Sequence, residues 1–527
     1  MNDSARFCVD TPNPASSIDP GFKRQAPRPV SLQENDYLEK FDDSTLWYDA
    51  FLDDDCVRLT APPPMNLQQE IVAKLESSLN CPSEITVHNL DRVSHFLLPI
   101  SVEAQNSFLI NITNNQIELR PDSNKRSKYK DKTVLFSKSK NNDLQWISDW
   151  VQYYVSNHGV DAVLLYDNGS TEYSTAEVLE AITVKGVDVA TVVSWPFKFG
   201  PQGGKWNGPT AAPWDSDFCE YGIIEHARHK YLSDCATLIA HDIDELLVVE
   251  DNRSLSEHLA QTKSDYLKYS GIWVEDVRES LASAPTFKDY FIVSSKGSPT
   301  TTKWVANPKN INHAIQWKTH GVAGLRPEET PLLKHRHFKG ITTNWKWQRA
   351  KSRTHPTRGE VIDYALASNM NSAYSTQILH GQRGAAYKTG SPESQKQHLK
   401  AIEEVMNPYR WNKEGLVKVW YWRPTALILD FIQKDSGMKI AFELRVQNGR
   451  VSLVATGRDK RTLSQISELA KMLEVPFYEN SNRHWELDWW KLYVNPCSLA
   501  ADCIQAITSV LATISNRLSV TKSATNK

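Results

Sequence analysis

The sequence predicts an α/β protein whose central domain holds a mostly parallel β-sheet between helices. Strands alternate with helices through residues 131–380, which is the pattern of such a sheet. Short alternating strands in residues 36–130 predict a β-rich N-terminal domain, and a hairpin with two helical segments predicts a small α/β accessory domain over residues 411–527. Residues 1–35, rich in Pro, Ser and Asp, are expected to form a disordered or loosely docked arm, and residues 381–410 a linker.

Composition narrows the class of protein. The chain has 527 residues, 60 Lys and Arg against 62 Asp and Glu, and a net charge of -2, which argues against a basic nucleic-acid-binding surface. No stretch of about 18 apolar residues occurs, and the N-terminus lacks an apolar signal segment. The seven cysteines form no CxxC pair, as is typical of a reducing compartment. We therefore expect a cytoplasmic protein without a membrane span, either free or at the inner face of the membrane.

The central domain is predicted element by element from hydrophobic spacing. Gly159 follows the first helix and is the usual residue at a helix C-terminus. The expected elements are, in order, a strand over Thr133–Phe136, a helix over Leu144–Asn157, a strand over Ala162–Tyr166, a helix over about 176–183, a strand over Val187–Val193, a helix over 217–235 and a strand that begins at Leu238.

The most informative segment is Leu238–Val249, in which an Asp-Ile-Asp triplet, residues 242–244, separates two strongly apolar runs. Two carboxylates at the end of a buried strand can bind one hard divalent cation, and such a cation can bind a diphosphate. Two other acidic clusters have simpler explanations. Residues 53–55 are expected to form an exposed turn, and residues 215–217 to cap the helix that follows them.

Ligands of a parallel α/β sheet bind beyond the carboxyl ends of its strands. Asp167 follows the second predicted strand, and Asp242 follows the fourth. Because both carboxylates fall at such ends, we expect them at the same edge of the sheet.

Several segments of the central domain resemble the GT-A glycosyltransferases, in particular glycosyltransferase family 92 and related bacterial surface-polysaccharide transferases. The resemblance covers about residues 132–350. It rests on Asn141–Asp143 leading into Trp150-Val151, Gly159–Asp161, Leu165–Thr171, Trp195–Phe197, Asp242–Glu245, Lys303–Pro308, and His337–Lys339 with Arg349. The resemblance implies a GT-A-like, Rossmann-like fold for this domain.

The resemblance also implies roles for residues that would bind the donor. The turn after the second strand, with Asp167 and Asn168, would lie near the base or ribose of a nucleotide sugar. Its alternative is an Asx-turn that only stabilises the loop. Lys303 and Arg349 would contact phosphate, with surface salt bridges as the alternative.

A metal site is the second implication. Asp242 and Asp244 would bind Mn²⁺ or Mg²⁺ and reach the ribose and diphosphate, with Asp242 in both the metal and the nucleotide-sugar site. His337 holds the place of a histidine that often completes the metal shell. His335 lies two residues away, on the same face of an extended segment, and stays open as an alternative.

An inverting transferase needs one carboxylate to take the proton of the acceptor hydroxyl. Glu275 and Asp276 follow the predicted strand Ser270–Val274, on the side of the domain where the acceptor is expected, and either is a candidate catalytic base. The pair Glu328-Glu329 competes with them.

These inferences predict a metal-dependent glycosyltransferase that moves a hexose from a UDP-sugar to a glycan or glycolipid acceptor in cell-surface polysaccharide synthesis. No nucleic-acid partner is expected. A sugar nucleotidyltransferase would need a loop rich in Gly and Arg where the chain has Ser137–Asp143. A non-catalytic scaffold that binds glycans or nucleotide sugars is the other alternative. The apolar stripe of a helix expected over Leu499–Leu518 either packs on its own sheet or joins two copies of the chain.

Overall fold

In the computed structural model of the chain, the described residues are 6–54, 56–79, 84–99, 107–112, 115–202, 214–250, 253–278, 281–344, 349, 351–357 and 359–374, followed by strands within residues 416–487. The chain forms two compact units, Met1–Tyr374 and Ser375–Lys527. The predicted N-terminal and central domains therefore lie in one unit.

A large mixed sheet runs through the first unit. In sheet order, its main path is β1 (Phe7–Asp10), β13 (Val189–Ser194), β12 (Ala162–Asp167), β11 (Thr133–Ser139), β14 (Thr237–Ala240), β18 (Pro299–Ala306), β16 (Tyr266–Val274), β17 (Ile292–Ser294) and β23 (Glu360–Ile362). The strands from β1 to β14 are parallel, and β18 is antiparallel to both β14 and β16. The α/β class is confirmed, but the sheet is mixed because an antiparallel half is joined to the parallel one.

The order of the parallel strands creates a switch point. The chain passes from β11 to β12 and β13 on one side, and then returns to place β14 on the other side of β11. The helices between these strands are α5 (Leu144–His158), α6 (Thr175–Ile182) and α7 (Phe218–Ala227). In open α/β sheets the crevice at such a reversal is where ligands bind. The carboxyl ends of β11 and β14 are therefore the expected location of a site.

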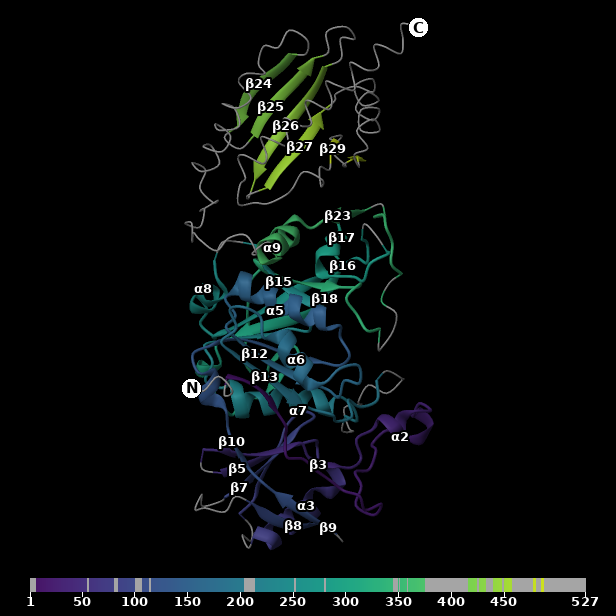
Figure 1. The fold of residues 1–527 in the computed structure, drawn as a ribbon, viewed down its shortest axis with the longest axis vertical. Coiled ribbons are helices and arrows are strands. Elements are labelled where there is room, and N and C mark those ends of the chain that lie inside the picture. Colours follow the sequence, from purple (N-terminus) through teal and green to yellow (C-terminus); the bar gives the residue numbers. More distant parts are fainter. Residues whose placement is uncertain are drawn as a thin grey trace. The chain divides into compact units, whose positions relative to one another are not determined.

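Alternating side chains of the parallel strands enter two separate cores. Leu135 and Val163 pack with α5 and α6 on one face, whereas Val134 and Leu164 pack with α7 on the other. Burial on both faces explains why these strands are apolar throughout rather than alternating. Figure 1 shows α7 between the central sheet and the N-terminal strands.

The helix boundaries follow local capping signals. The side chain of Asp143 accepts a hydrogen bond from the backbone N–H of Gln145 at the start of α5, and Gly159 ends it in the left-handed region at φ 66°. Ser174 and Glu177 form a capping box at the start of α6. These helices lie within one residue of the predicted spans.

The segment predicted to form the N-terminal domain contains a five-stranded sheet. Its order is β10 (Asp122–Ser123), β4 (Asp49–Asp53), β5 (Cys56–Ala61), β7 (Ser94–Leu98) and β6 (Thr86–Asn89). Helix α3 (Gln68–Leu79), which the sequence analysis does not predict, buries Ile71 and Leu75.

Within residues 6–35, the part of the predicted arm that the structure describes, the chain is ordered rather than disordered. Strand β1 pairs in parallel with β13, so that Phe7 lies opposite Ala190. The short segment Phe-Cys-Val-Asp is apolar enough to extend the sheet edge, although the surrounding composition is polar.

Paired charges fill the interface between α7 and the N-terminal sheet. Asp49 accepts hydrogen bonds from His226 at 2.7 Å and from Lys230 at 2.8 Å, and all three side chains are buried. Glu225 pairs with Arg228 and lies 3.2 Å from Nε2 of His95. Because breaking a buried pair leaves an uncompensated charge, these contacts hold the N-terminal sheet in one position on α7.

This interface should make the protein sensitive to acid. Burial lowers the pKa of His95 to about 4, although its hydrogen bond to Glu225 opposes the shift. Between pH 6.5 and 4 the unfolded chain binds a proton that the folded chain does not, so the free energy of unfolding falls as pH falls, by about 3 kcal/mol for this residue. Urea unfolding at several pH values should show that the free energy of unfolding falls less steeply with decreasing pH in His95→Gln than in the wild type. An equal loss in both proteins would contradict the assignment.

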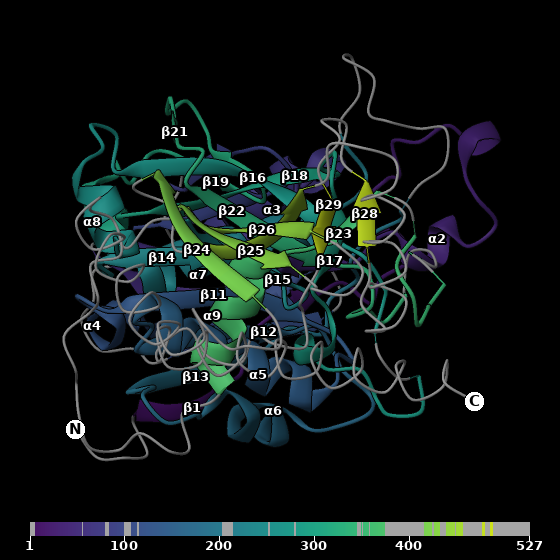
Figure 2. The ribbon, with the colours of Figure 1, turned by 90° about the horizontal axis from the view of Figure 1, so that it is seen from above.

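The second unit is described through its strands. They form one six-stranded antiparallel sheet in the order β24 (Leu416–Arg423), β25 (Ala426–Ile432), β26 (Lys439–Gln447), β27 (Arg450–Thr456), β29 (Trp485–Leu487) and β28 (Phe477–Glu479), shown in Figure 2. The predicted hairpin is confirmed by β26 and β27. The helices expected near residues 463–473 and 499–518, and the linker over 381–410, lie outside the described residues.

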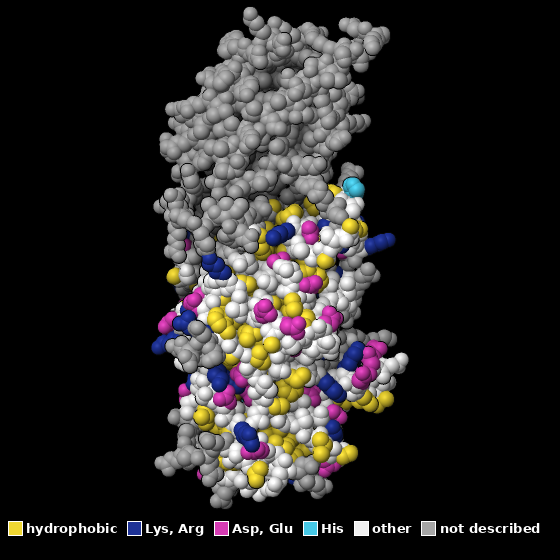
Figure 3. Space-filling model, in the orientation of Figure 1, with side chains coloured by type: hydrophobic (Ala, Val, Ile, Leu, Met, Phe, Trp, Pro, Cys, Tyr) yellow, Lys and Arg dark blue, Asp and Glu magenta, His cyan; other side chains and the backbone are white. Residues whose placement is uncertain are grey.

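Charges of both signs are interspersed on the face drawn in Figure 3. Among the described residues, none of the helices combines the length and the apolar character needed to cross a bilayer.

Candidate active site

The Asp-Ile-Asp triplet forms the turn between β14 and β15 (Glu245–Val249) at the switch point of the sheet. The backbone N–H of Glu245 donates to the carbonyl of Asp242 at 3.1 Å, which closes the turn. Strand β15 then leaves the parallel half and pairs with β22 (Leu333–Phe338), with Glu245 directly opposite His337. The backbone therefore fixes both carboxylates of the turn at the strand ends.

Two lysines hold the first carboxylate. Asp242 lies 3.1 Å from Nζ of Lys138, at the end of β11, and 2.5 Å from Nζ of Lys303, on β18. Lys138 also contacts Glu220 of α7 at 2.7 Å. Burial would raise the pKa of Asp242, but the two lysines lower it well below its usual range. This half of the site therefore keeps its carboxylate ionised and its two ammonium groups close together.

A small cleft that is open to solvent lies beside this lysine pair. Residues from both strands at the switch point line it, including Ser137 and Lys138 from β11 and His241 and Asp242 after β14. The side chain of Asp242 is 37% exposed, so the carboxylate is reachable from solvent. An anionic ligand in this cleft would meet the lysine ammonium groups.

The second carboxylate faces a different set of partners. Asp244 Oδ2 lies 3.2 Å from Nε2 of His337 and contacts Nη1 of Arg349. The ring of His337 stacks on Trp273 with their centroids 4.1 Å apart. Burial would raise the pKa of Asp244, but His337 and then Arg349 lower it. His337 and Arg349 thus stabilise the charge of this carboxylate.

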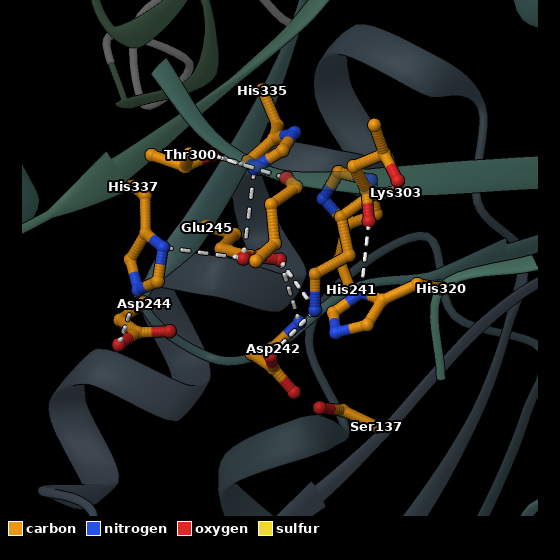
Figure 4. A network of polar contacts seen from close by, with 12 residues as sticks. Ser137, His241, Asp242, Asp244, Glu245, Thr300, Lys303, His320, His335 and His337 are labelled. Atoms are coloured by element: carbon orange, nitrogen blue, oxygen red, sulfur yellow. Dashed lines mark hydrogen bonds and ion pairs between the residues drawn. The ribbon is translucent and has the colours of Figure 1, made fainter. Parts of the chain in front are cut away.

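Glu245 is fully buried between these two halves. Its Oε2 lies 3.0 Å from Lys303 Nζ, and its Oε1 lies 3.5 Å from Nδ1 of His337 and 3.7 Å from Nε2 of His335. Burial raises the pKa of Glu245, and Lys303 only partly offsets this. Figure 4 shows Glu245 at the centre, with Asp242 and Asp244 on its two sides.

Two further histidines pack beneath the site. His241 contacts the hydroxyls of Tyr154 and Tyr269 at 2.8 and 2.6 Å, so both ring nitrogens have partners. His335 is fully buried, and its Nε2 lies 2.7 Å from the hydroxyl of Thr300. Burial lowers the pKa of both histidines well below the usual value, so both rings are neutral.

The predicted nucleotide contacts after β12 have structural partners. Asp167 is buried and accepts hydrogen bonds from the hydroxyl and the backbone N–H of Ser170, at 2.5 and 3.1 Å. Asn168 donates to the backbone carbonyls of Trp195 and Phe197. These contacts stabilise the loop, as the alternative role requires, although Asp167 bonds the backbone three residues on rather than the two of an Asx-turn. Contact with a nucleotide stays a prediction.

The two candidate bases differ in their surroundings. Glu275 forms an ion pair with Lys339 at 2.7 Å, and its side chain is 13% exposed. Asp276 is buried and accepts a hydrogen bond from Ser352 at 2.7 Å. Glu328, from the competing pair, accepts a hydrogen bond from the backbone N–H of Lys263 at 2.5 Å. None of these contacts joins the network around Glu245.

Of the three predicted metal ligands, the structure brings two together. Asp244 Oδ2 and His337 Nε2 face each other, and Arg349 Nη1 contacts both, at 3.0 Å from the histidine. A cationic nitrogen thus takes the place that a cation shared by these two atoms would have. Asp242 is engaged by the lysines instead. Asp244 and His337 therefore fit a cation that has two protein ligands. Such a number is usual where substrate phosphates and water supply the rest of the coordination shell.

The other acidic clusters have other partners. The exposed turn expected over residues 53–55 is only partly correct: Asp54 adopts φ 51° between β4 and β5, but Asp53 ends β4, is buried and pairs with Arg58. Asp217 occupies the expected N-cap position of α7, but its side chain makes no capping hydrogen bond and pairs with Arg92 instead. The buried Asp215 pairs with Arg28.

Sequence reasoning missed two participants, Lys138 and Glu220, and left Glu245 open between a structural partner for a nearby cation and a ligand. Lys138 could have been found, because it ends the first strand of the sheet, where ligands bind. Glu220 gave no signal, since its role depends on the packing of α7 against β11. Glu245 adjoins the motif, but its central place depends on the pairing of β15 with β22.

Residues 136–367 match the sequence model of glycosyltransferase family 92. The match begins in β11, ends in α9 (Tyr364–Tyr374), and includes every residue of the network described above. No curated protein matches the chain. This region is therefore that of a glycosyltransferase family 92-like protein, and the match indicates glycosyltransferase activity.

Proposed function

We propose that this protein transfers a hexose from a nucleoside diphosphate sugar, with UDP-hexose as the first donor to test, to a glycan acceptor in cell-surface polysaccharide synthesis. The observation that carries the proposal is the position of the Asp-Ile-Asp turn. It lies at the switch point of the sheet, beside an open cleft and between cationic side chains. The strand order around this point supports a GT-A-type arrangement for the domain.

The lysine pair fits the diphosphate of such a donor. Lys138 and Lys303 are held by Asp242, and Glu220 holds Lys138 from the other side. Both lysine ammonium groups are thus positioned before a ligand arrives. Preorganised positive charge near a leaving group is worth most where water is excluded. We propose that these lysines bind the diphosphate and that Asp242 orients them and the ribose.

Asp244 and His337 are the proposed ligands of Mn²⁺ or Mg²⁺. When bound, the cation would neutralise charge that develops on the departing diphosphate. Arg349, which now contacts both ligand atoms, would then be free to turn toward phosphate.

Glu275 is the better placed of the candidate bases. It follows β16 two residues after Trp273, whose ring stacks on His337, so an extended chain puts both side chains on one face. Asp276 is buried and accepts a hydrogen bond from the hydroxyl of Ser352. We propose that Glu275 accepts the proton of the acceptor hydroxyl in an inverting transfer, with Lys339 holding it in place.

The proposal is tested by measuring release of the nucleoside diphosphate from a panel of nucleotide sugars, with and without Mn²⁺ and with glycan acceptors. We expect Mn²⁺-dependent turnover with at least one UDP-hexose. Binding of a nucleotide sugar without turnover for any donor and acceptor would favour a non-catalytic scaffold instead.

Cation binding should depend on pH through His337. Burial would lower the pKa of this ring, but Asp244 raises it above the usual value by favouring the imidazolium. A metal ligand must be neutral, so Mn²⁺ affinity should rise about tenfold per pH unit below that pKa and level off above it. Titration of Mn²⁺ with UDP present, followed by electron paramagnetic resonance at several pH values, measures this. A flat profile between pH 6 and 8.5 would rule out His337 as a ligand.

A further inference from the structure

Two buried polar atoms face each other beside the proposed cation ligands. Glu245 Oε1 and His337 Nδ1 lie 3.5 Å apart, and neither has a hydrogen-bond partner among the described residues. A buried polar atom without a partner costs about 1–3 kcal/mol. The two atoms are complementary, because a carboxylate oxygen accepts and a ring N–H donates. A small approach of the two groups would satisfy both.

The other ring nitrogen of His337, Nε2, lies between a donor and an acceptor. It is 3.0 Å from Nη1 of Arg349, which can only donate, and 3.2 Å from the carboxylate oxygen Oδ2 of Asp244, which can only accept. A cation bound at Nε2 of the neutral ring requires the proton on Nδ1, which faces Glu245. This is the tautomer that leaves Nε2 available for a cation.

The second oxygen of Glu245 serves the lysine half of the site. Its Oε2 accepts a hydrogen bond from the backbone N–H of Asp242 at 3.2 Å and lies 3.0 Å from Lys303 Nζ. Lys303 in turn contacts Asp242 Oδ2. One buried carboxylate thus contacts both the diphosphate half and the cation half.

Strand pairing and packing fix Glu245 in this position. It lies opposite His337 in the β15–β22 ladder, and its side chain has no exposed surface. On the neighbouring strand, Gly271 leaves room for the ring of His335, since a Cβ there would come within 2.2 Å of that ring. The ring packs against Glu245 and helps to exclude water from it.

We propose that Glu245 is a positioning residue, which keeps the proton of His337 on Nδ1 so that Nε2 can bind the cation, and which holds Lys303 and the Asp242 turn in register with it. The proposal rests on the cation site of the proposed function. Carboxylates that orient a histidine ligand in this way typically contribute 10- to 100-fold to metal affinity.

The first test is Mn²⁺ affinity, measured by electron paramagnetic resonance with saturating UDP, in the wild type and in Glu245→Gln. Glutamine has one acceptor oxygen for three donors, so we expect binding about 10- to 100-fold weaker. Glu250→Gln, directly after the same strand and in a partly exposed pair with Lys334, is the matched control and should bind as the wild type does. If Glu245→Gln does not fold, Glu245→Asp is the second variant. Its shorter side chain keeps the negative charge but places it farther from His337, so Mn²⁺ should also bind more weakly.

The second test reads the tautomer directly. In protein labelled with ¹⁵N-histidine, the His337 signals, assigned with His337→Asn, should show a proton on Nδ1 in the wild type. In Glu245→Gln they should show a mixture of tautomers. A purely structural role of Glu245 would leave this ratio unchanged.

The outcomes separate the two proposals. If the wild type does not bind Mn²⁺, or if Asp244→Asn binds as well as the wild type, the cation site of the proposed function is wrong. If the wild type binds, Asp244→Asn does not, and Glu245→Gln binds like the wild type, only the positioning role is overturned. A metal that copurifies without UDP and is lost in Glu245→Gln would also overturn it, since Nδ1 would then be a ligand in a site with Glu245 and His335.

Discussion

Replacing Asp244 with asparagine is expected to lower kcat of glycosyl transfer by about 10²- to 10³-fold, the range seen when one preorganised electrostatic group is removed. The substitution removes a charged cation ligand and also the counter-charge that His337 and Arg349 share. The side chain is only 14% exposed, so water cannot replace the carboxylate easily. Initial rates of nucleoside diphosphate release at saturating donor and Mn²⁺ measure the effect.

The matched control is Asp188→Asn. That carboxylate is 58% exposed and pairs only with Lys132 among the contacts described, so its loss should change the rate less than twofold. Equal rates for Asp244→Asn and the wild type would remove the cation site from the mechanism. Activity that is lost in Asp244→Asn but restored by high Mn²⁺ would place the effect on cation binding rather than on the chemical step.

Much of the parallel half could be predicted because its signals are local. The apolar strands β11 and β12, the cap at Asp143 and the glycine after α5 each depend on a few neighbouring residues. The Asp-Ile-Asp turn was recognisable for the same reason, since two apolar strands flank it. Hydrophobic spacing of this kind can be read from a short stretch of sequence without knowledge of the tertiary contacts.

The arrangement of charges could not be predicted, because it depends on contacts between distant strands. Lys138 and Lys303 meet Asp242 across 104 and 61 residues of sequence. The β1 edge strand was missed for a related reason: its pairing with β13 outweighs a polar local composition. Asp167 shows the same dependence on structure, since this carboxylate at a strand end accepts hydrogen bonds from Ser170 in its own turn, a contact that the sequence left open.

Replacing Lys303 with methionine is expected to affect both stability and catalysis. The ammonium lies between Asp242 and the fully buried Glu245, at 2.5 and 3.0 Å, and methionine keeps the length without the charge. Removing one partner of a buried ion pair typically costs 3–5 kcal/mol. We expect a loss of about this size in the free energy of unfolding by urea near pH 8, together with a lower kcat.

The loss of stability in Lys303→Met should grow as pH rises. Burial already raises the pKa of Glu245, and without Lys303 it should rise further. A folded-state pKa above the unfolded value means that folding is favoured while the acid is protonated, and that this stability is lost as pH increases through the folded pKa.

The double substitution Lys303→Met with Glu245→Gln removes the buried charge and should recover much of the stability, but not the activity. Lys334→Met, which removes a pair that is about one-third exposed, should cost less than about 1 kcal/mol at any pH. A Lys303→Met protein as stable as the wild type at pH 8 would show that Glu245 does not depend on this ammonium.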